Sequence, residues 1–173
     1  MSENMLEIRD LLIEAEIEGA WKPIVKSLSL NLKKGEIVGL IGESGAGKST
    51  LGLASLGYTK PGCRIVSGSI RFDGQELTTL PEPELRKLRG VRVSYVAQSA
   101  AAAFNPAHRL IDQFSETSIQ HGRMNASEAD QRGRELFRQL ELPDPDHFGE
   151  RYPHQVSGGQ LQRAMTAMAM GCQ

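Results

Sequence analysis

Apolar and polar residues alternate along the first third of the chain, as expected for β-strands that bury one face. The alternation covers residues 6–13 and returns over residues 24–32, so both stretches are predicted as strands, antiparallel to each other. Residues 19–23 (Gly-Ala-Trp-Lys-Pro) lie between them and predict a turn. Residues 65–72 alternate again, as a strand pair or one bent strand, and end at Asp73-Gly74, a strong turn signal.

Two further apolar stretches predict strands of the core. Residues 37–41 (Ile-Val-Gly-Leu-Ile) are predicted as a buried strand that leads into a glycine-rich segment. Residues 91–97 are predicted as a short strand that ends at Gln98. Ligands of open parallel sheets bind beyond the carboxyl ends of the strands, so Gln98 would lie where a ligand could bind. A glutamine after a strand is also common as a loop hydrogen-bonding residue, and both interpretations stay open.

The second half of the chain has the apolar spacing of helices. Helices are predicted over residues 81–89, 112–121 and 127–142, and the last has Ser127 as its expected N-cap, with Asp130 three residues on. The apolar stripe of this helix is predicted to pack in a core; it consists of Leu136, Phe137 and Leu140. A final helix is expected after residue 157, with an inner face that carries Leu161, Met165 and Met168.

The segment from Gly42 to Thr50 has the pattern of a phosphate-binding loop, in which a strand, a glycine-rich turn and a helix follow one another. Glycines allow the tight turn and bring backbone N–H groups close to phosphate oxygens. Lys48 would supply a charge for the β- and γ-phosphates, and the Ser49 hydroxyl would bind Mg²⁺. The alternative is a glycine-rich turn without a ligand. The candidate phosphate-binding residues are Gly42, Glu43, Ser44, Gly45, Ala46, Gly47, Lys48, Ser49 and Thr50.

A second glycine motif, Ser157-Gly158-Gly159-Gln160, precedes the last predicted helix. Ser157 and Gln160 have the spacing of a capping box, so the motif could simply begin a helix. The two glycines argue for more, because glycine weakens the first turn of a helix but exposes its N–H groups to an anion. Such a helix end cannot reach the first site's phosphates from an arbitrary position. It could instead bind phosphates that another molecule holds.

Composition and charge narrow the class of protein. The chain has 20 Lys and Arg residues against 21 Asp and Glu residues, so no overall field attracts nucleic acid and no nucleic-acid partner is expected. No apolar run approaches the ~18 residues that span a bilayer, and residues 1–4 lack the features of a signal peptide. Cys63 and Cys172 have no disulfide or zinc spacing, which suits a reducing compartment. A soluble cytoplasmic protein is expected.

On these motifs the chain resembles the ATP-binding subunits of ABC transporters over its whole length. Residues 42–49 match the Walker A loop, Gln98 matches the Q-loop, and residues 156–160 match the LSGGQ signature with valine in place of the usual leucine. Three shorter matches resemble the oligopeptide/dipeptide importer subfamily: residues 42–45, 104–106 and 152–155. The resemblance implies an α/β fold, the P-loop NTPase fold of the ABC ATPase cassette, with a parallel-sheet core, N-terminal antiparallel strands and a helical insert. It also implies three parts: a nucleotide-binding core at residues 1–108, a helical insert at 109–156 and the signature segment at 157–173.

The resemblance further implies a mechanism. Two subunits, identical or different, would hold two ATP molecules head to tail, and Lys48 and Ser49 of one would face Ser157 and Gly159 of the other. Lys48 and Gln98 would be the catalytic residues, and Gln98 and Ser49 would bind Mg²⁺. The nucleotide of the partner would contact Ser157, Gly158, Gly159 and Gln160. The helical insert would dock on an integral-membrane permease at the inner face of the cell membrane, where ATP hydrolysis drives uptake of peptides or a related small solute.

The chain departs from the family pattern at the adenine-stacking residue and at the Walker B strand with the switch histidine. The aromatic residue that stacks on adenine in the family has its place near Ala15, and Trp21, six residues later, could take that role or be a surface turn residue. The Walker B strand with its Asp-Glu pair and the switch histidine after it have no counterpart before Gln173. His154 precedes the signature and is expected to be a loop residue. The cassette is therefore expected to be incomplete at its C-terminus and marginally stable alone, since each buried apolar side chain of a strand contributes about 1.5–3 kcal/mol.

Two other functions stay open on the sequence. One is a nucleotide-binding interaction module that does not hydrolyse ATP, which fits a chain with Walker A and signature motifs but no Walker B. The other is a soluble ABC ATPase of DNA repair or translation. The chain shows no basic stripe, zinc-binding cysteines or long coiled-coil heptads that would favour this last class.

Overall fold

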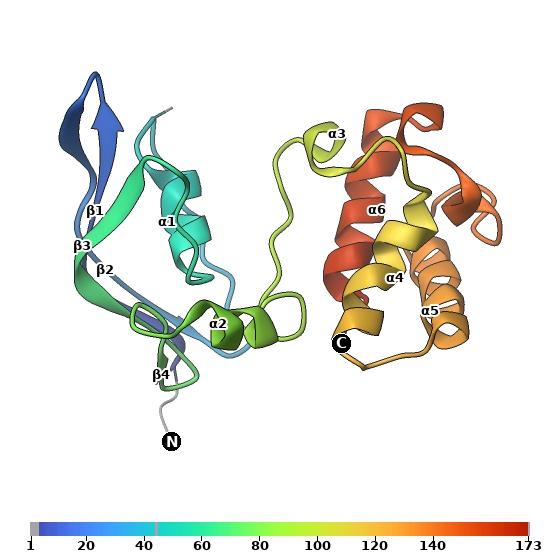
Figure 1. The fold of residues 1–173 in the computed structure, drawn as a ribbon, viewed down its shortest axis with the longest axis horizontal. Coiled ribbons are helices and arrows are strands. Elements are labelled where there is room, and N and C mark those ends of the chain that lie inside the picture. The colour runs from blue at the N-terminus through green and yellow to red at the C-terminus, as the bar shows by residue number, and fades with distance from the viewer. Residues whose placement is uncertain (1–3, 44, 173) are drawn as a thin grey trace. The chain divides into compact units, whose positions relative to one another are not determined.

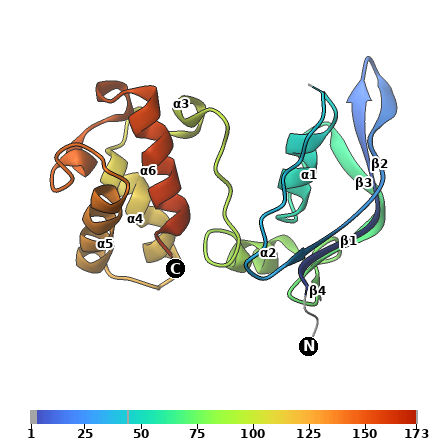
Figure 2. The same ribbon diagram turned by 180° about the vertical axis from the view of Figure 1, so that it is seen from behind.

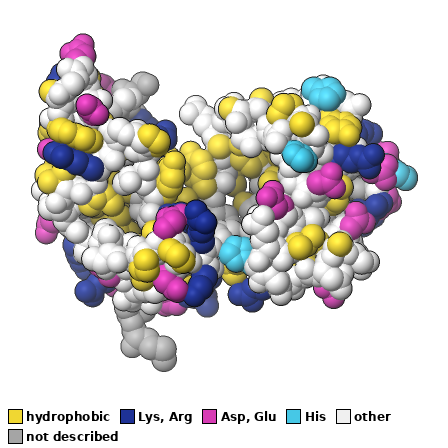
Figure 3. Space-filling model, viewed as in Figure 1, with side chains coloured by type: hydrophobic (Ala, Val, Ile, Leu, Met, Phe, Trp, Pro, Cys, Tyr) yellow, Lys and Arg dark blue, Asp and Glu magenta, His cyan; other side chains and the backbone are white. Residues whose placement is uncertain are grey.

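The structure, a computed structural model, describes residues 4–43 and 45–172 of the chain. It divides into two compact units, an N-terminal unit (Met1–Leu85) and a C-terminal unit (Arg86–Gln173). Within the described ranges, no helix combines the length and the apolar composition that crossing a membrane would require. On the face drawn in Figure 3, charged side chains of both signs are interspersed over the surface of each unit.

The N-terminal unit contains a four-stranded antiparallel sheet with the strand order β2-β1-β3-β4 (Figure 1). Its strands are β1 (Asn4–Ile17), β2 (Ala20–Lys33), β3 (Cys63–Phe72) and β4 (Gln75–Glu76). Ile8 in the central strand β1 lies opposite Leu30 of β2 and Ile70 of β3, and the Ile8 and Ile70 side chains are fully buried. The alternating apolar positions of the sequence therefore form the inner face of this sheet, which confirms the predicted antiparallel strands.

Strand β3 is a single bent strand rather than a strand pair. Gly68 adopts a φ of +94°, and a Cβ at this position would lie 2.6 Å from the carbonyl oxygen of Arg9. The register between β1 and β3 shifts at this point, so the bend is a β-bulge that only glycine fits. Asp73 and Gly74 both have positive φ and form the predicted turn into β4.

The turn between β1 and β2 is shorter than predicted. It consists of Glu18 and Gly19, both with positive φ, and Ala20 already pairs with Ile17. Trp21 therefore lies in strand β2, opposite Glu16, and not in a turn. The prediction over residues 19–23 was wrong because a two-residue hairpin turn needs only two residues with left-handed backbone, and Pro23 is tolerated in an edge strand.

Helix α1 (Lys48–Ala54) lies against one face of the sheet in the N-terminal unit (Figures 1 and 2), and its buried residues are Leu51 and Ala54. It begins directly after the glycine-rich segment, as predicted. Helix α2 (Glu82–Leu88) starts one residue after Pro81 and confirms the helix predicted there.

The two stretches predicted as core strands form no strand in the structure. Ile37 and Ile41 are 97% and 99% exposed, and residues 37–41 belong to no strand. Residues 91–97 contribute a single bridge, between Arg89 and Val93. The prediction of a strand at each place is wrong for this chain, because a strand needs a hydrogen-bonded neighbour and the described residues offer none. The described sheet is thus the antiparallel part of the predicted fold.

The C-terminal unit is helical, and α4, α5 and α6 lie side by side in both views (Figures 1 and 2). Its elements are α3 (Ala100–Ala103), α4 (Leu110–Gln120), α5 (Ala126–Gln139), the 3₁₀ turns η1 (Phe148–Glu150) and η2 (Pro153–Gln155), and α6 (Gly158–Met170). Phe137 sits at the centre of the core, with edge-to-face contacts to Phe114 and Phe148 at centroid distances of 5.7 and 5.3 Å. The predicted stripe is confirmed, since Leu136 and Phe137 are buried and Leu140 packs on the same core.

The N-cap of α5 is Asn125, and not Ser127 as predicted. The Asn125 side chain accepts a hydrogen bond from the amide of Glu128, and the Glu128 carboxylate accepts one from the amide of Asn125. Ser127 lies inside the first turn. Asn125 is the better cap because an Asn-x-x-Glu capping box gives hydrogen-bond partners to two backbone N–H groups, while the predicted Ser127–Asp130 pair would give partners to fewer.

Candidate functional site

The glycine-rich loop passes close to strand β2 at Gly47. Gly47 has a φ of +81° and is the N-cap of α1. A Cβ at Gly47 would lie 2.7 Å from the carbonyl oxygen of Ile24 and 3.1 Å from the Val25 side chain. The loop therefore passes so close to the β2 backbone that only glycine fits, and this contact fixes where α1 begins.

Lys48 closes the loop. Its ammonium group donates hydrogen bonds to the carbonyl oxygens of Gly42 (2.8 Å), six residues earlier, and Glu43 (2.6 Å), five residues earlier. The amide of Ala46 also donates to the Glu43 carbonyl oxygen, at 3.2 Å. The positive charge of Lys48 is thus held beside the carbonyl groups of Gly42 and Glu43.

Hydrogen-bond donors without partners gather at the same place. In the part of the chain that the structure describes, the amides of Gly45, Gly47, Lys48, Ser49 and Thr50 have no acceptor. Gly45 has a φ of +84° and, like Ser49, is exposed. A set of free N–H groups beside an ammonium fits a phosphate group, whose oxygens only accept. Ser44, the remaining residue of the predicted loop, lies outside the described residues.

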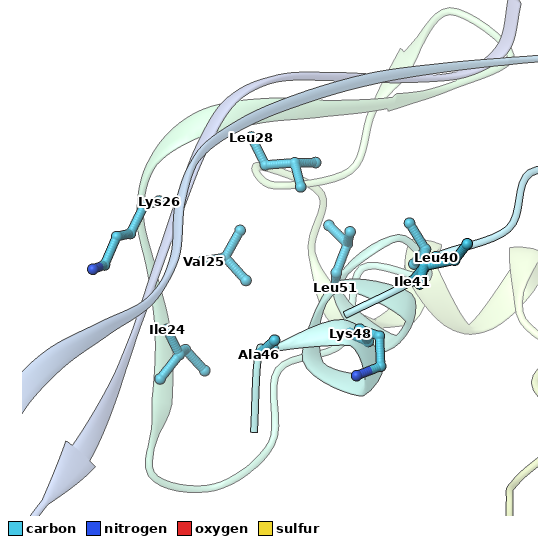
Figure 4. Close-up of a pocket in the computed structure, with 10 residues that line it drawn as sticks. Ile24, Val25, Lys26, Leu28, Leu40, Ile41, Ala46, Lys48 and Leu51 are labelled. Atoms are coloured by element: carbon cyan, nitrogen blue, oxygen red, sulfur yellow. The ribbon is translucent and has the colours of Figure 1, made fainter. Parts of the chain in front are cut away.

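A hollow of about 290 Å³ adjoins the loop (Figure 4). Val25 and Leu28 of β2 face Ala46 and Leu51 across it, and Lys48 lies at the loop side (Figure 4). Its lining is largely apolar, and its charged residues are Lys48 on the loop side and Lys26 on the β2 side. Among the described residues, no three His, Cys, Asp or Glu side chains lie together as a metal site.

The signature turn begins α6 with the predicted capping box. The Ser157 hydroxyl accepts a hydrogen bond from the amide of Gln160 (3.3 Å), and the Gln160 side chain accepts one from the amide of Ser157 (2.9 Å). Gly158 and Gly159 are exposed, and nothing in the chain lies within 4 Å of a Cβ at either place. The capping box therefore explains the serine and the glutamine, but the fold of the described chain gives no reason for the two glycines.

Gln98 lies in an exposed bend of the C-terminal unit, and its side chain makes no hydrogen bond to the described residues. The preceding residue, Ala97, is bound by two side chains of α6, Gln162 and Met165. Gln98 and the signature turn therefore belong to one unit, in which α6 carries the signature turn and binds the residue before Gln98, and the loop around Lys48 belongs to the other unit. Sequence patterns did not indicate the contact of Gln162 with Ala97, because the two residues are 65 positions apart.

Trp21, the candidate adenine-stacking residue, has one ring face covered. The guanidinium of Arg64 lies 4.1 Å from the centroid of the Trp21 ring, and it also donates to the Glu14 carboxylate at 2.7 Å. Trp21 is 40% exposed. Arg64 occupies the strand on the other side of β1, so a cation–π pair spans the sheet at this end. His154, expected to be a loop residue, lies in η2 and stacks on Tyr152.

Comparison with known proteins identifies the family. The chain matches the ABC transporter family over residues 25–173 and belongs to it. It is 38% identical to the peptidoglycan transport ATP-binding protein YejF of Agrobacterium fabrum, over 98% of this chain and 31% of that protein. It is 36% identical to the dipeptide transport ATP-binding protein DppD of Escherichia coli, over 97% of this chain and 51% of that protein. The chain thus spans about a third to a half of the length of these curated relatives.

A solved structure of the same class confirms the fold. The ATP-binding cassette MJ0796, in a dimeric post-hydrolysis state bound to ADP and Pi, superposes with a TM-score of 0.84 at 26% identity. The superposition covers 97% of this chain and 70% of that chain. The fold class predicted from the motifs, an ABC ATPase cassette of the P-loop NTPase type, is therefore confirmed.

Proposed function

We propose that this chain is the nucleotide-binding part of an ATPase subunit of an ABC importer for peptides or a related small solute. One observation carries the proposal. The Lys48 ammonium is held beside a row of backbone N–H groups that have no acceptor among the described residues, in a chain that is related over nearly its whole length to a dipeptide transport ATP-binding protein. Phosphate oxygens are the ligands that such a donor set binds best.

Specific residues would share the work of binding MgATP. Lys48 and the amides of Gly45 and Gly47 would hold the β- and γ-phosphates. Ser49 and Gln98 would complete the shell of a Mg²⁺ ion, which supplies charge neutralisation between the phosphates. Trp21 would stack on the adenine base. Arg64 covers one face of its ring, so the opposite face would contact the base.

The signature turn would act on a nucleotide held by a second ATPase subunit, identical or different. Gly158 and Gly159 support this, because their exposed amides have no acceptor among the described residues and no side-chain contact requires glycine there. A flat, donor-rich helix start allows the close approach of a phosphate. The segment 109–156 would dock on an integral-membrane permease and place the subunit at the inner face of the cell membrane.

Nucleotide titration of the 173-residue chain tests the proposal. Wild type and Lys48→Ala are titrated with MgATP and followed by calorimetry, with Lys60→Ala as the matched control because Lys60 is an exposed lysine of the same unit. A charge-assisted hydrogen bond contributes about 1.5–3 kcal/mol, so Lys48→Ala should weaken binding roughly 10- to 150-fold. Lys60→Ala should leave the affinity unchanged. An affinity of Lys48→Ala within twofold of wild type would overturn the assignment of the loop.

A second measurement separates a transport ATPase from a module that only binds nucleotide. Phosphate release is followed for the complete transporter, assembled with its permease and partner subunit, with Lys48→Ala or wild-type sequence in this subunit. Release that depends on the permease and falls with Lys48→Ala supports the importer. Binding without any release in the complete complex would favour the non-hydrolysing module.

A further inference from the structure

The segment that carries Gln98 is attached to α6 through both backbone polar groups of Ala97, its N–H and its carbonyl oxygen. The amide of Ala97 donates to the Met165 sulfur at 3.0 Å, and its carbonyl oxygen accepts a hydrogen bond from the Gln162 side-chain amide at 3.1 Å. Met165 is 6% exposed, so its sulfur is held by the core. Among the residues that the structure describes, no other hydrogen bond holds positions 94–98. These two side chains are therefore what fixes the backbone just before Gln98.

A second anchor follows Gln98 at once. Ala100 and Phe104 are 4% and 6% exposed and belong to the same core as Leu161 of α6. Gln98 and Ser99 thus form a two-residue exposed bend between two points that are both packed on α6. So short a connection cannot shift without moving the helix or breaking one of the anchors.

The same helix carries the signature turn. Gln162 lies five positions after Ser157, about 7.5 Å along the axis of a continuous helix. We propose that Gln162 and Met165 are positioning residues that tie Gln98 to the signature turn, so that the two move as one body. This inference rests on the proposed function only for the nucleotide response; the tie itself is a property of the C-terminal unit.

Hydrogen exchange without nucleotide tests the tie. Gln162→Leu keeps the bulk of the side chain but removes the donor to Ala97, and Gln162→Glu keeps the length but cannot donate at pH 7. Both should speed amide exchange in residues 97–99 about five- to tenfold. The matched control is Gln131→Leu, an exposed glutamine of α5, which should change it less than twofold. Equal exchange in wild type and both Gln162 variants would overturn the inference, provided that all chains unfold at similar urea concentrations.

Nucleotide-dependent NMR shifts test whether the tie transmits movement. In wild type, MgATP should shift the amide resonances of residues 97–99 and of Gly158 and Gly159 with one common apparent Kd. In Gln162→Leu the affinity should stay within twofold, while the shifts at the two glycines fall by more than half. Undiminished glycine shifts would overturn the coupling. If wild type bound no MgATP, the proposed function and the nucleotide response would both fail, and the exchange rates would still decide whether the tie exists.

Discussion

The ammonium nitrogen of Lys48 lies 2.8 Å from the carbonyl oxygen of Gly42, so the first residue of α1 holds the far end of the loop that precedes the helix. A lysine ammonium has three N–H donors, and Gly42 and Glu43 accept two of them. One donor remains for a phosphate oxygen. The loop is thereby held in shape before a ligand arrives, and less conformational entropy is lost when a phosphate binds.

Gly47→Ala tests the shape of the loop. The added Cβ would meet the Ile24 carbonyl oxygen at 2.7 Å, and the left-handed backbone at a φ of +81° disfavours any other residue. Destabilisation by about 2–3 kcal/mol is expected, together with loss of MgATP binding, because α1 cannot begin at the same place. Urea unfolding and calorimetric titration measure the two effects.

Gly52→Ala is the matched control in the same helix. Nothing lies within 4 Å of a Cβ at Gly52, and its backbone is helical. Alanine should therefore be neutral or stabilise the chain by up to about 1 kcal/mol. If the two glycine variants had equal stability, the close approach of the loop to β2 would not exist in solution.

Local patterns predicted the elements that depend on neighbours in sequence and failed where the neighbour is distant. The alternation of β1 and β2 and the Ser157–Gln160 capping box are short-range features, and the structure has both. Residues 37–41 have the composition of a buried strand, yet pairing depends on a partner strand that the pattern cannot show. The contacts of Gln162 and Arg163 with distant carbonyl groups also left no sequence signal.

Ser157→Ala tests whether the capping box contributes to stability. Loss of the bond from the Gln160 amide should cost about 1 kcal/mol in urea unfolding, and Ser157→Asp should restore most of it. Asn125→Ala, at the N-cap of α5, should cost a similar amount because its bond to the Glu128 amide is equivalent. A lowered midpoint for Asn125→Ala alone would mean that Ser157 stabilises nothing in the isolated chain.

His147 should make the stability of the chain depend on pH. Its hydrogen bond with Asp144, helped by the charges of Asp144 and Glu150, raises the pKa of His147 above its ordinary value of about 6.5. A raised pKa in the folded state means that the stabilisation is complete below about pH 6.5 and is lost as the pH rises through the higher folded-state value.

The measurement compares urea midpoints at pH 5.5 and pH 8.5. Wild type should lose more stability between the two than His147→Gln does. Asp144→Asn should behave like His147→Gln, because it removes the hydrogen-bond partner of the imidazole. An identical pH dependence in wild type and both variants would show that the pair does not stabilise the folded state.

Arg163 links α6 to the end of α5, and its removal should destabilise the C-terminal unit. One terminal nitrogen of its guanidinium donates to the carbonyl oxygens of Leu140 (3.1 Å) and Glu141 (2.5 Å), at the C-terminal end of α5. The Leu140 carbonyl group is at the C-cap of α5, where carbonyl groups have no partner within the helix, and a positive charge there also interacts favourably with the helix dipole. Arg163→Ala should therefore cost about 1–3 kcal/mol in urea unfolding.

The control is Arg132→Ala on α5, whose surface ion pair with Glu135 should contribute less than about 1 kcal/mol. Arg163→Lys should recover only part of the loss, since an ammonium lacks the fork of the guanidinium but keeps the charge. Gln162 and Arg163 are adjacent on α6 but bind different segments, Ala97 in one case and the end of α5 in the other. Arg163→Ala should therefore leave the amide exchange rates of residues 97–99 within twofold of wild type at low denaturant. Faster exchange there would mean that α6 as a whole loosens, and the contacts of Gln162 and Arg163 would then be one cooperative unit.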